Sequence, residues 1–184
     1  MTLTLQPNLF ALSLVLTDED KANDENYTPT SIVKPFRELV GGFDLDPFSC
    51  DRANQTIQAK TFWTKSDDAF AQDWSQYENK WVNPPYSKGN IDKAIAYAIA
   101  VADIGNTFVL TNSNTSSNWF LSVQKSCVCY LTFKHRIEFT NPKNDGQKKK
   151  SGNDTSQTLF YFGKFTPRQF KACCDHLGNV AIVV

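Results

Sequence analysis

The feature that most constrains the fold of this chain is a rigid turn that ends an apolar strand. The turn consists of four consecutive residues, Asn83, Pro84, Pro85 and Tyr86. The preceding pair, Trp-Val at 81–82, is typical of a buried strand. Each proline fixes φ near about −65° and lacks an N–H group, so the strand cannot continue past the turn. The turn therefore holds a side-chain amide and an aromatic ring at a strand's carboxyl end, where open α/β sheets bind their ligands.

These groups suit the methylation of a planar exocyclic amine. The lone pair of such a nitrogen is delocalised into the ring, and positive charge develops on the nitrogen as it attacks a methyl sulfonium. The Asn83 side-chain oxygen and the Pro84 carbonyl oxygen can accept hydrogen bonds from the two amine hydrogens and stabilise that charge. Tyr86 offers an aromatic face on which a base removed from a duplex can stack. The alternative interpretation is an ordinary strand and turn with a core aromatic residue.

Further motifs occur in an order that is found in one family. They are Phe-Asp-Leu-Asp-Pro-Phe-Ser-Cys at 43–50, Asn54, Phe-Trp-Thr at 62–64, Asp-Asp at 67–68, Gln-Asp-Trp at 72–74 and Trp-Val-Asn-Pro-Pro-Tyr-Ser at 81–87. With these motifs the chain resembles the small phage and prophage DNA N6-adenine methyltransferase (Dam) family. The tetrapeptide of these amino-methyltransferases is (Asp/Asn/Ser)-Pro-Pro-(Tyr/Phe/Trp). The resemblance covers about residues 27 to 165 and is strongest from Phe43 to Ser87.

The resemblance implies a Rossmann-like methyltransferase fold, S-adenosylmethionine as methyl donor and adenine N6 in double-stranded DNA as acceptor. It also implies a role in marking or protecting phage DNA, as in restriction-modification. By position, the catalytic motif is Asn83, Pro84, Pro85 and Tyr86. The cofactor-binding positions fall on Tyr27, Thr28, Pro29, Asp46, Pro47 and Phe48, and the acidic position that meets the cofactor's adenine ring falls on Asp73 in preference to Asp68.

One departure from the family pattern concerns the first cofactor motif. Methyltransferases usually place glycines after the first strand so that the backbone can approach the cofactor, whereas Ser49, Cys50 and Asp51 follow Phe48 here. A catalytically degenerate domain that binds DNA is therefore one alternative. Another keeps the chemistry and changes the acceptor to an RNA base, cytosine N4 or a protein glutamine amide, although glutamine enzymes normally have a glycine-rich first motif.

The distribution of charge favours a nucleic-acid partner. Residues 1–123 contain 9 Lys/Arg and 15 Asp/Glu, net −6, whereas residues 124–184 contain 10 and 4, net +6. Phosphate neutralisation is local, so a basic half is sufficient for DNA contact. The candidate DNA-binding residues are Ser87, Trp119, Lys134, His135, Arg136, Lys148, Lys149 and Lys150. A solvated loop or an ordinary turn would produce the same charge clusters.

Size and composition indicate one domain. The 184 residues are 41% hydrophobic and predict one methyltransferase domain, 1–184, with an N-terminal extension at 1–26 and a flexible basic loop at 140–157. The absence of an apolar stretch of about 18 residues excludes a membrane span, and the absence of an export signal favours the cytoplasm or the interior of a host cell. The five cysteines include no Cys-x-x-Cys pair, so no metal site is predicted. A monomer is favoured.

Alternating strands and helices predict an α/β fold with a mainly parallel central sheet and antiparallel edge strands. Strands are expected at 43–46, near 61, and at 80–83, 107–110, 127–133, 136–139, 158–162 and 180–184. Helices are expected from Thr30 or Ser31 to Val40, at 91–102, around Trp119, and at 166–176. The rest of 49–79 is expected to be irregular.

Overall fold

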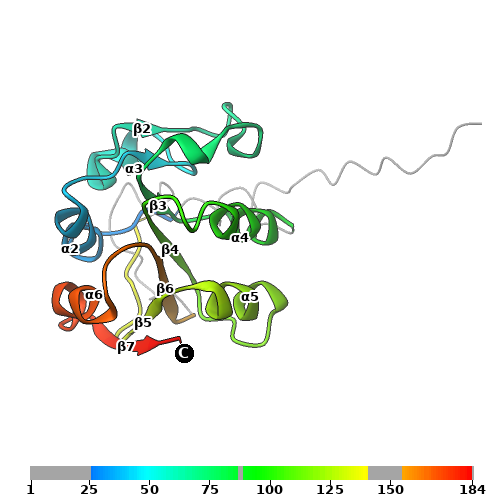
Figure 1. Ribbon diagram of the computed structural model, residues 1–184. Coiled ribbons are helices and arrows are strands. Elements are labelled where there is room, and N and C mark those ends of the chain that lie inside the picture. Colours follow the sequence, from blue (N-terminus) through cyan, green and yellow to red (C-terminus); the bar gives the residue numbers. More distant parts are fainter. Residues whose placement is uncertain (1–25, 87–88, 141–154, 184) are drawn as a thin grey trace, which may run out of the picture.

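The computed structural model describes residues 26–86, 89–140 and 155–183, which form helices around a seven-stranded mixed β-sheet (Figure 1). The strands are β1 (Leu45–Asp46), β2 (Thr61–Phe62), β3 (Asn79–Val82), β4 (Asn106–Asn112), β5 (Cys129–Phe133), β6 (Gln157–Phe162) and β7 (Gly178–Ile182). The helices are α2 (Thr30–Val40), α3 (Asp51–Ile57), α4 (Asn90–Ala100), α5 (Asn118–Ser126) and α6 (Pro167–Cys174). Two short 3₁₀ helices, η1 (Ala69–Ala71) and η2 (Trp74–Gln76), precede β3.

The strands lie in the order β2-β1-β3-β4-β6-β5-β7. The first four are mutually parallel, and the pairings of β4 with β6, β6 with β5 and β5 with β7 are antiparallel. This arrangement confirms the predicted α/β, Rossmann-like methyltransferase fold with a parallel core and antiparallel strands toward one edge.

The strand order reverses direction between β1 and β3. From β1 the chain crosses through α3 to β2 on one side, and from β3 it crosses through α4 to β4 on the other side. Helices that leave in opposite directions cannot both cover the gap between the two strands. A crevice therefore opens at the carboxyl ends of β1 and β3, as in other open α/β sheets. Asp46 ends β1 and Asn83 follows β3, so both residues lie at this crevice.

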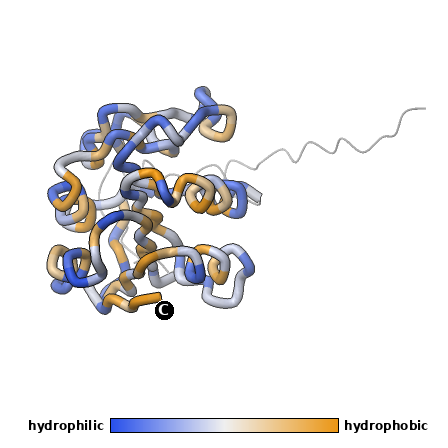
Figure 2. The backbone as a smooth tube through the Cα atoms, viewed as in Figure 1, coloured by the Kyte–Doolittle hydropathy of each residue, from blue (hydrophilic) through white to orange (hydrophobic). Residues whose placement is uncertain are grey.

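Helices cover both faces of the sheet. Figure 1 shows α2 and α6 on one face and α4 and α5 on the other. On the first face, Phe36 of α2 stacks on Phe170 of α6 with ring centroids 5.7 Å apart. On the second face, Ile95 of α4 and Phe120 of α5 belong to a separate buried cluster. Hydrophobic residues concentrate along the strands and on the parts of the helices that face them (Figure 2).

The helix boundaries follow local stop and start signals. Helix α2 begins after Pro29 and ends at Gly41, whose φ of 72° lies in the left-handed region that glycine adopts freely. Helix α6 begins with a capping box, in which the Thr166 side chain bonds to the Gln169 backbone and the Gln169 side chain bonds back. Among the described residues, no helix is long and apolar enough to cross a membrane.

Two of the expected local structures are wrong. The expected strand at 136–139 is absent from the sheet: Ile137 and Phe139 are buried alternately, but the Ile137 N–H donates to the Gln157 side chain at 3.0 Å instead of to a neighbouring strand. The region expected to be irregular contains α3, a seven-residue helix capped by the Cys50 sulfur, which accepts a hydrogen bond from the Ala53 N–H at 3.5 Å. The expected short strand near residue 61 is confirmed.

Hydrogen bonds join the amino ends of β3 and β4, at the end of the strands opposite the crevice. The Asn106 N–H donates to the Glu78 carbonyl at 2.8 Å, and the Asn106 side chain donates to the Asn79 side chain at 2.9 Å. Lys80 is fully buried and its Nζ donates to the Ile104 carbonyl at 2.7 Å. Burial lowers the pKa of Lys80 to about 8. Gly105, with a φ of 66°, lies directly against the Glu78 backbone.

This close approach makes Gly105 a sensitive position. Gly105→Ala is expected to lower the free energy of unfolding by roughly 2–4 kcal/mol, because a Cβ would collide with the Glu78 backbone and the left-handed φ adds strain. The matched control is Gly41→Ala, at a φ of 72° with no atom within 4 Å, which should cost only about 1 kcal/mol. Urea denaturation of both variants measures the difference. Equal losses would contradict the role given to the Glu78 contact.

Candidate active site

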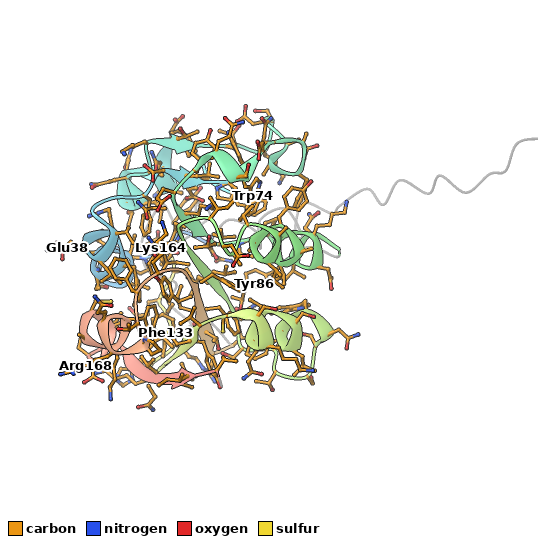
Figure 3. The ribbon with its side chains drawn as sticks, in the orientation of Figure 1. Glu38, Trp74, Tyr86, Phe133, Lys164 and Arg168 are labelled. Carbon is orange, nitrogen blue, oxygen red and sulfur yellow. The ribbon has the colours of Figure 1, made fainter. Side chains whose placement is uncertain are left out.

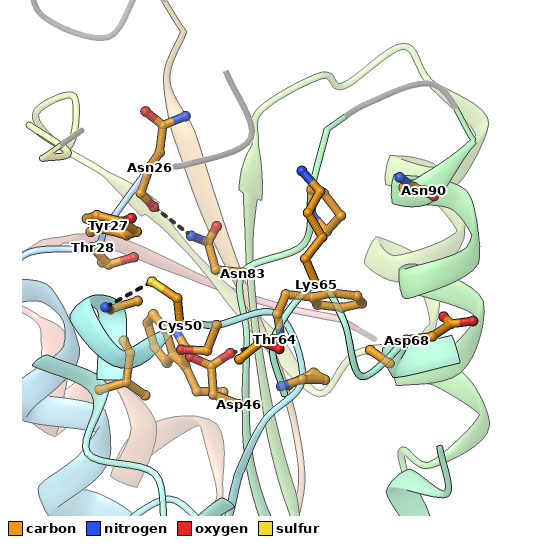
Figure 4. A pocket seen from close by; sticks show the side chains of 18 of the residues that line it. Asn26, Tyr27, Thr28, Asp46, Cys50, Thr64, Lys65, Asp68, Asn83 and Asn90 are labelled. Atoms are coloured by element: carbon orange, nitrogen blue, oxygen red, sulfur yellow. Dashed lines mark hydrogen bonds between the residues drawn. The ribbon is translucent and has the colours of Figure 1, made fainter. Parts of the chain in front are cut away.

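A cavity of about 580 Å³ lies at the crevice between the carboxyl ends of β1 and β3 (Figure 4). Its wall combines three stretches of chain: 26–28 before α2, 46–50 after β1, and 64–70 before η2. Asn83 and Pro85 of the proline turn also belong to the wall. The cavity thus brings together the turn, the first-strand motif and the segment before α2, which are far apart in the sequence.

The Asn83 side chain has a fixed orientation in this cavity. Its Nδ2 donates to the backbone carbonyl of Asn26 at 3.1 Å, and the side-chain oxygen, at the opposite end of the amide, has no hydrogen-bond partner among the described residues (Figure 4). Asn83 is half-buried and directly follows the buried Val82 of β3. An amide held in this way directs its nitrogen to Asn26 and leaves its oxygen free to accept a hydrogen bond from a ligand.

The other three residues of the turn differ in their surroundings. Pro84 is buried, Pro85 lines the cavity, and Tyr86 packs on the face of the sheet that α4 and α5 cover (Figure 3). The Tyr86 hydroxyl donates to the Leu110 carbonyl of β4 at 3.5 Å. Burial raises the pKa of this hydroxyl well above its ordinary value of 10.0, so it stays protonated. The ring is therefore tied to β4 at its hydroxyl end.

The segment before α2 forms one side of the cavity. Tyr27 and Thr28 line it, and Pro29 is the residue immediately before the helix. Thr28 is 4% exposed, and its Oγ1 has no hydrogen-bond partner among the described residues. A buried hydroxyl in the wall of a cavity is suited to bond with a polar ligand, because it otherwise carries a desolvation cost.

Asp46 is a buried carboxyl group on the opposite wall. It is 2% exposed, and its Oδ1 accepts a hydrogen bond from the Phe48 N–H at 3.3 Å. Burial raises the pKa of Asp46 from 3.8 to about 7. Pro47 and Phe48 also line the cavity, and the Phe48 ring packs on Phe70 at a centroid distance of 5.4 Å. A cationic ligand group beside Asp46 would favour its ionised form.

The stretch after β1, which corresponds to the expected first cofactor motif, continues without a glycine. Ser49 and Cys50 line the cavity directly after β1, and the Cys50 sulfur caps α3. The backbone at Cys50 is extended, with φ −154° and ψ 171°, a conformation that any residue can adopt. The absence of glycine from the motif is therefore compatible with an open cavity wall at this position.

The two acidic candidates after β2 lie in different places. Asp68 lines the cavity, and its carboxylate accepts a hydrogen bond from the Phe70 N–H at 3.2 Å. Asp73 does not line it: its carboxylate accepts hydrogen bonds from the Ser75 N–H at 2.9 Å and the Ser75 hydroxyl at 2.6 Å. The hydrogen bond from the Ser75 side chain lowers the pKa of Asp73. The expected preference for Asp73 does not fit this geometry, which favours Asp68.

The candidate DNA-binding residues are not gathered in one place by the described structure. Lys134, His135 and Arg136 are exposed directly after β5, and none of the three lines the cavity. Trp119 is half-buried on α5, with its ring 5.7 Å from Phe120. The remaining candidates, Ser87, Lys148, Lys149 and Lys150, lie outside the described residues.

Sequence reasoning missed several residues of the cavity wall, including Asn26, Lys65 and Asn90. Asn26 contributes through its backbone carbonyl, for which no sequence pattern exists. Lys65 and Asn90 are polar residues in stretches without periodicity, so nothing in the sequence separates them from surface residues. Trp81 was assigned to a buried strand and also lines the cavity.

Comparison with known proteins identifies the family. The family model for DNA N-6-adenine-methyltransferase (Dam) matches residues 16–175. The chain belongs to the Dam family. It is therefore an S-adenosylmethionine-dependent DNA adenine methyltransferase, which confirms the predicted family. The match includes the whole cavity wall. No curated protein matches the chain.

Dam-family methyltransferases use S-adenosylmethionine as methyl donor, and the chemistry of the cavity wall is compatible with this molecule. The donor carries an ammonium group, a carboxylate and a sulfonium at one end and an adenosine at the other. The unpaired Thr28 hydroxyl and the buried Asp46 carboxyl group offer an acceptor and a counter-charge for the cationic end. Phe70 and Asp68 offer an aromatic face and an acceptor for the adenosine.

The raised pKa of Asp46 predicts a pH-dependent stability. Between about 3.8 and about 7 the folded chain holds a proton that the unfolded chain has lost, so the free energy of unfolding falls as the pH rises. The fall should be about 2 kcal/mol between about pH 5 and pH 7, because the slope of about 1.4 kcal/mol per unit weakens as the pH approaches the pKa of the folded state. Asp46→Asn should lack it. Urea denaturation of both proteins at several pH values measures the contribution.

Asp73→Asn is the matched control for this measurement. The lowered pKa of Asp73 means that its contribution to stability is lost only as the pH falls below its ordinary value of 3.8. Its stability curve should therefore run parallel to that of the wild type between about pH 5 and pH 8. An Asp46→Asn curve that also runs parallel to the wild type would show that Asp46 is ionised in the folded protein.

Proposed function

We propose that this Dam-family protein is a site-specific methyltransferase that rotates its target adenine out of the DNA duplex and places N6 against Asn83. The observation that carries the proposal is the fixed orientation of the Asn83 amide. Its nitrogen donates a hydrogen bond to the Asn26 carbonyl, and its oxygen is available as an acceptor in the cavity. An adenine amino group has two hydrogens to donate, and an acceptor at the carboxyl end of β3 matches one of them.

The proline turn supplies the second acceptor in this proposal. The Pro84 carbonyl accepts the other N6 hydrogen, and the two prolines fix its direction because their φ angles cannot change freely. Both acceptors become more effective as positive charge develops on N6 during attack, so they stabilise the transition state more than the ground state. Proton loss follows once the charge has developed, and no general base is assigned.

Tyr86 holds the extruded base in this proposal. Its hydroxyl is tied to the Leu110 carbonyl, which fixes the plane of the ring. Tyr86 is half-buried and does not line the cavity, so adenine would stack on the exposed part of the ring. Stacking on an aromatic ring is worth about 1–3 kcal/mol per base. Extrusion is required because N6 otherwise lies within the base stack, and it costs a few kcal/mol, which this stacking partly offsets.

The methyl group comes from the sulfonium of S-adenosylmethionine, the donor that the family uses. In our assignment, Tyr27, Thr28 and Asp46 bind the methionine end of the donor. The Thr28 hydroxyl and the Asp46 carboxyl group are buried polar groups of the cavity wall, and Tyr27 lies beside Thr28. Asp68 and Phe70 bind the adenosine end. Asn83 would then hold N6 beside the space between these two groups of residues, where a donor bound by them would supply the methyl group.

We assign phosphate contacts to the basic half of the chain. Lys134 and Arg136 are exposed and can neutralise phosphates or reach a guanine edge. Lys148, Lys149 and Lys150 give the segment outside the described residues the composition of a phosphate-binding loop. With these contacts the protein would bind DNA inside the cell, and methylation would mark or protect phage DNA.

The central test of the proposal is truncation of the catalytic amide. Asn83→Ala should lower the rate of methyl transfer from labelled S-adenosylmethionine to duplex DNA by at least about 100-fold, because a stabilising group of the transition state is lost. Binding of S-adenosylmethionine, measured by calorimetry, should persist. Asn179→Ala, at an exposed residue of β7, is the control and should retain full activity. Undiminished transfer by Asn83→Ala would remove the mechanism.

The assignment of phosphate contacts predicts a change in salt dependence. A triple alanine variant should weaken binding to DNA of any sequence and reduce the slope of log K against log salt by about 2–3, at about 0.9 per phosphate contact. The residues replaced are Lys148, Lys149 and Lys150.

The control for this experiment removes the same charge elsewhere. It replaces Lys34, Lys164 and Lys171, which are each paired with a carboxylate on the described surface. Fluorescence anisotropy with labelled duplexes at several salt concentrations compares the two variants. Equal slopes would show that net charge, and not this segment, governs binding.

A further inference from the structure

The Asn26 carbonyl that accepts from Asn83 belongs to a peptide unit that is held at both ends. Tyr27 and Thr140 form an isolated antiparallel bridge, in which the Tyr27 N–H donates to the Thr140 carbonyl at 2.9 Å and the Thr140 N–H donates to the Tyr27 carbonyl at 3.1 Å. The Asn26 carbonyl and the Tyr27 N–H are opposite ends of one peptide plane. One end is bonded to Thr140 and the other to the catalytic asparagine.

The two hydrogen bonds make the planar Asn26–Tyr27 peptide a rigid link between Thr140 and Asn83. A trans peptide directs its N–H and C=O in opposite directions within one plane, and rotation about the C–N bond is costly. Once Thr140 fixes the N–H, the direction of the Asn26 carbonyl is also fixed. The Tyr27 ring, which lies under the Arg52 guanidinium at 5.8 Å, and the buried Thr28 restrict the same segment further.

A carbonyl oxygen can only accept hydrogen bonds, so it determines which end of the Asn83 amide faces it. The nitrogen must point to Asn26, and the oxygen is then presented to the cavity (Figure 4). A free amide could rotate by half a turn and present a donor instead, which would oppose the hydrogens of an incoming amine.

We infer that the Asn26–Tyr27 peptide, held by Thr140, is a positioning element for the catalytic amide, and that this chain therefore requires asparagine and not aspartate at position 83. The inference rests on the proposed function of Asn83. The tetrapeptide of the wider group of enzymes admits Asp, Asn or Ser at this position. In this chain, however, a carboxylate would place one of its oxygens against the Asn26 carbonyl oxygen, where two acceptors repel each other.

Charged groups around the site affect any carboxylate introduced there. Asp46 carries a buried carboxyl group in the same cavity, Lys65 and Asp68 contribute opposite charges to its wall, and Arg52 lies over the Tyr27 ring. These groups are common to the wild type and the variant. The ratio of the two rates at each pH therefore separates the new carboxyl group from Asp46 and its neighbours.

The first experiment uses Asn83→Asp, which keeps the size and the acceptor oxygen of the side chain and changes its donor. Single-turnover methyl transfer at about pH 8 should be about 30-fold slower than in the wild type, because a displaced acceptor loses alignment with the amine. The ratio of variant to wild-type rate should rise as the pH falls, since a protonated carboxyl group can donate to Asn26. A ratio near one at all pH values, or one that is low and independent of pH, would overturn the inference.

The second experiment weakens the bridge itself. Thr140→Pro removes the Thr140 N–H, which donates to the Tyr27 carbonyl, and so loosens the bridge in which the Thr140 carbonyl holds the Tyr27 N–H. The variant should slow methyl transfer by about 10-fold. Thr140→Ala keeps both backbone groups and measures the contribution of the side chain. A loss in Thr140→Ala as large as in Thr140→Pro would overturn the inference.

A double-mutant cycle separates positioning from general destabilisation. If the bridge acts through Asn83, Thr140→Pro should have no further effect on the residual rate of Asn83→Ala. An equal fold loss in both backgrounds would show that the bridge acts by another route. If Thr140→Pro fails to fold, the pH dependence of Asn83→Asp still decides. Full activity of Asn83→Ala would refute the proposed function, whereas full activity of Asn83→Asp with an inactive Asn83→Ala would refute only this inference.

Discussion

The parallel pairing of β1 with β3 determines where chemistry can occur in this protein. Because the connections from these two strands run to opposite sides of the sheet, the space above their carboxyl ends is left uncovered by helices. The register pairs Leu45 with Lys80, so Asp46 and Trp81 emerge at nearly the same height. The buried carboxyl group and the proline turn thus face one cavity without any specific contact between them.

The electrostatic character of the cavity follows from two buried polar side chains in its wall, Asp46 and Thr28. Asp46 is buried without a paired cation among the described residues, and the Thr28 hydroxyl is buried without a partner there. Such groups lower the stability of the empty protein. In our proposal, a cationic donor molecule would relieve both costs when it binds. Affinity for the donor and instability of the empty cavity therefore have the same physical origin.

Much of this fold was predictable because hydrophobic periodicity and stop signals agree in the parallel half of the sheet. The helix at 30–40 has a clear end at two glycines, and the strand at 79–82 ends at two prolines. Helix α3 was not predictable, since a cysteine caps it and it spans only seven residues. The segment 136–139 has the alternating burial of a strand, but the Gln157 side chain takes the place of a neighbouring strand.

The candidate site was predictable where side-chain identity carries the signal. Asn83 and Asp46 are such residues, and the structure places both at the cavity. Asn26 was beyond sequence reasoning because its contribution is a backbone atom. The sequence led to a preference for Asp73 over Asp68 that the geometry does not favour, since both cap short 3₁₀ helices and only the path of the chain brings Asp68 to the cavity.

The contact between Gly105 and the Glu78 backbone has a consequence for the opposite end of β3. It aligns β3 with β4 at the amino ends of the two strands, which are remote from the cavity. The height of the proline turn above the sheet is therefore set by the strand register. The loops around the cavity do not have to hold the turn in place.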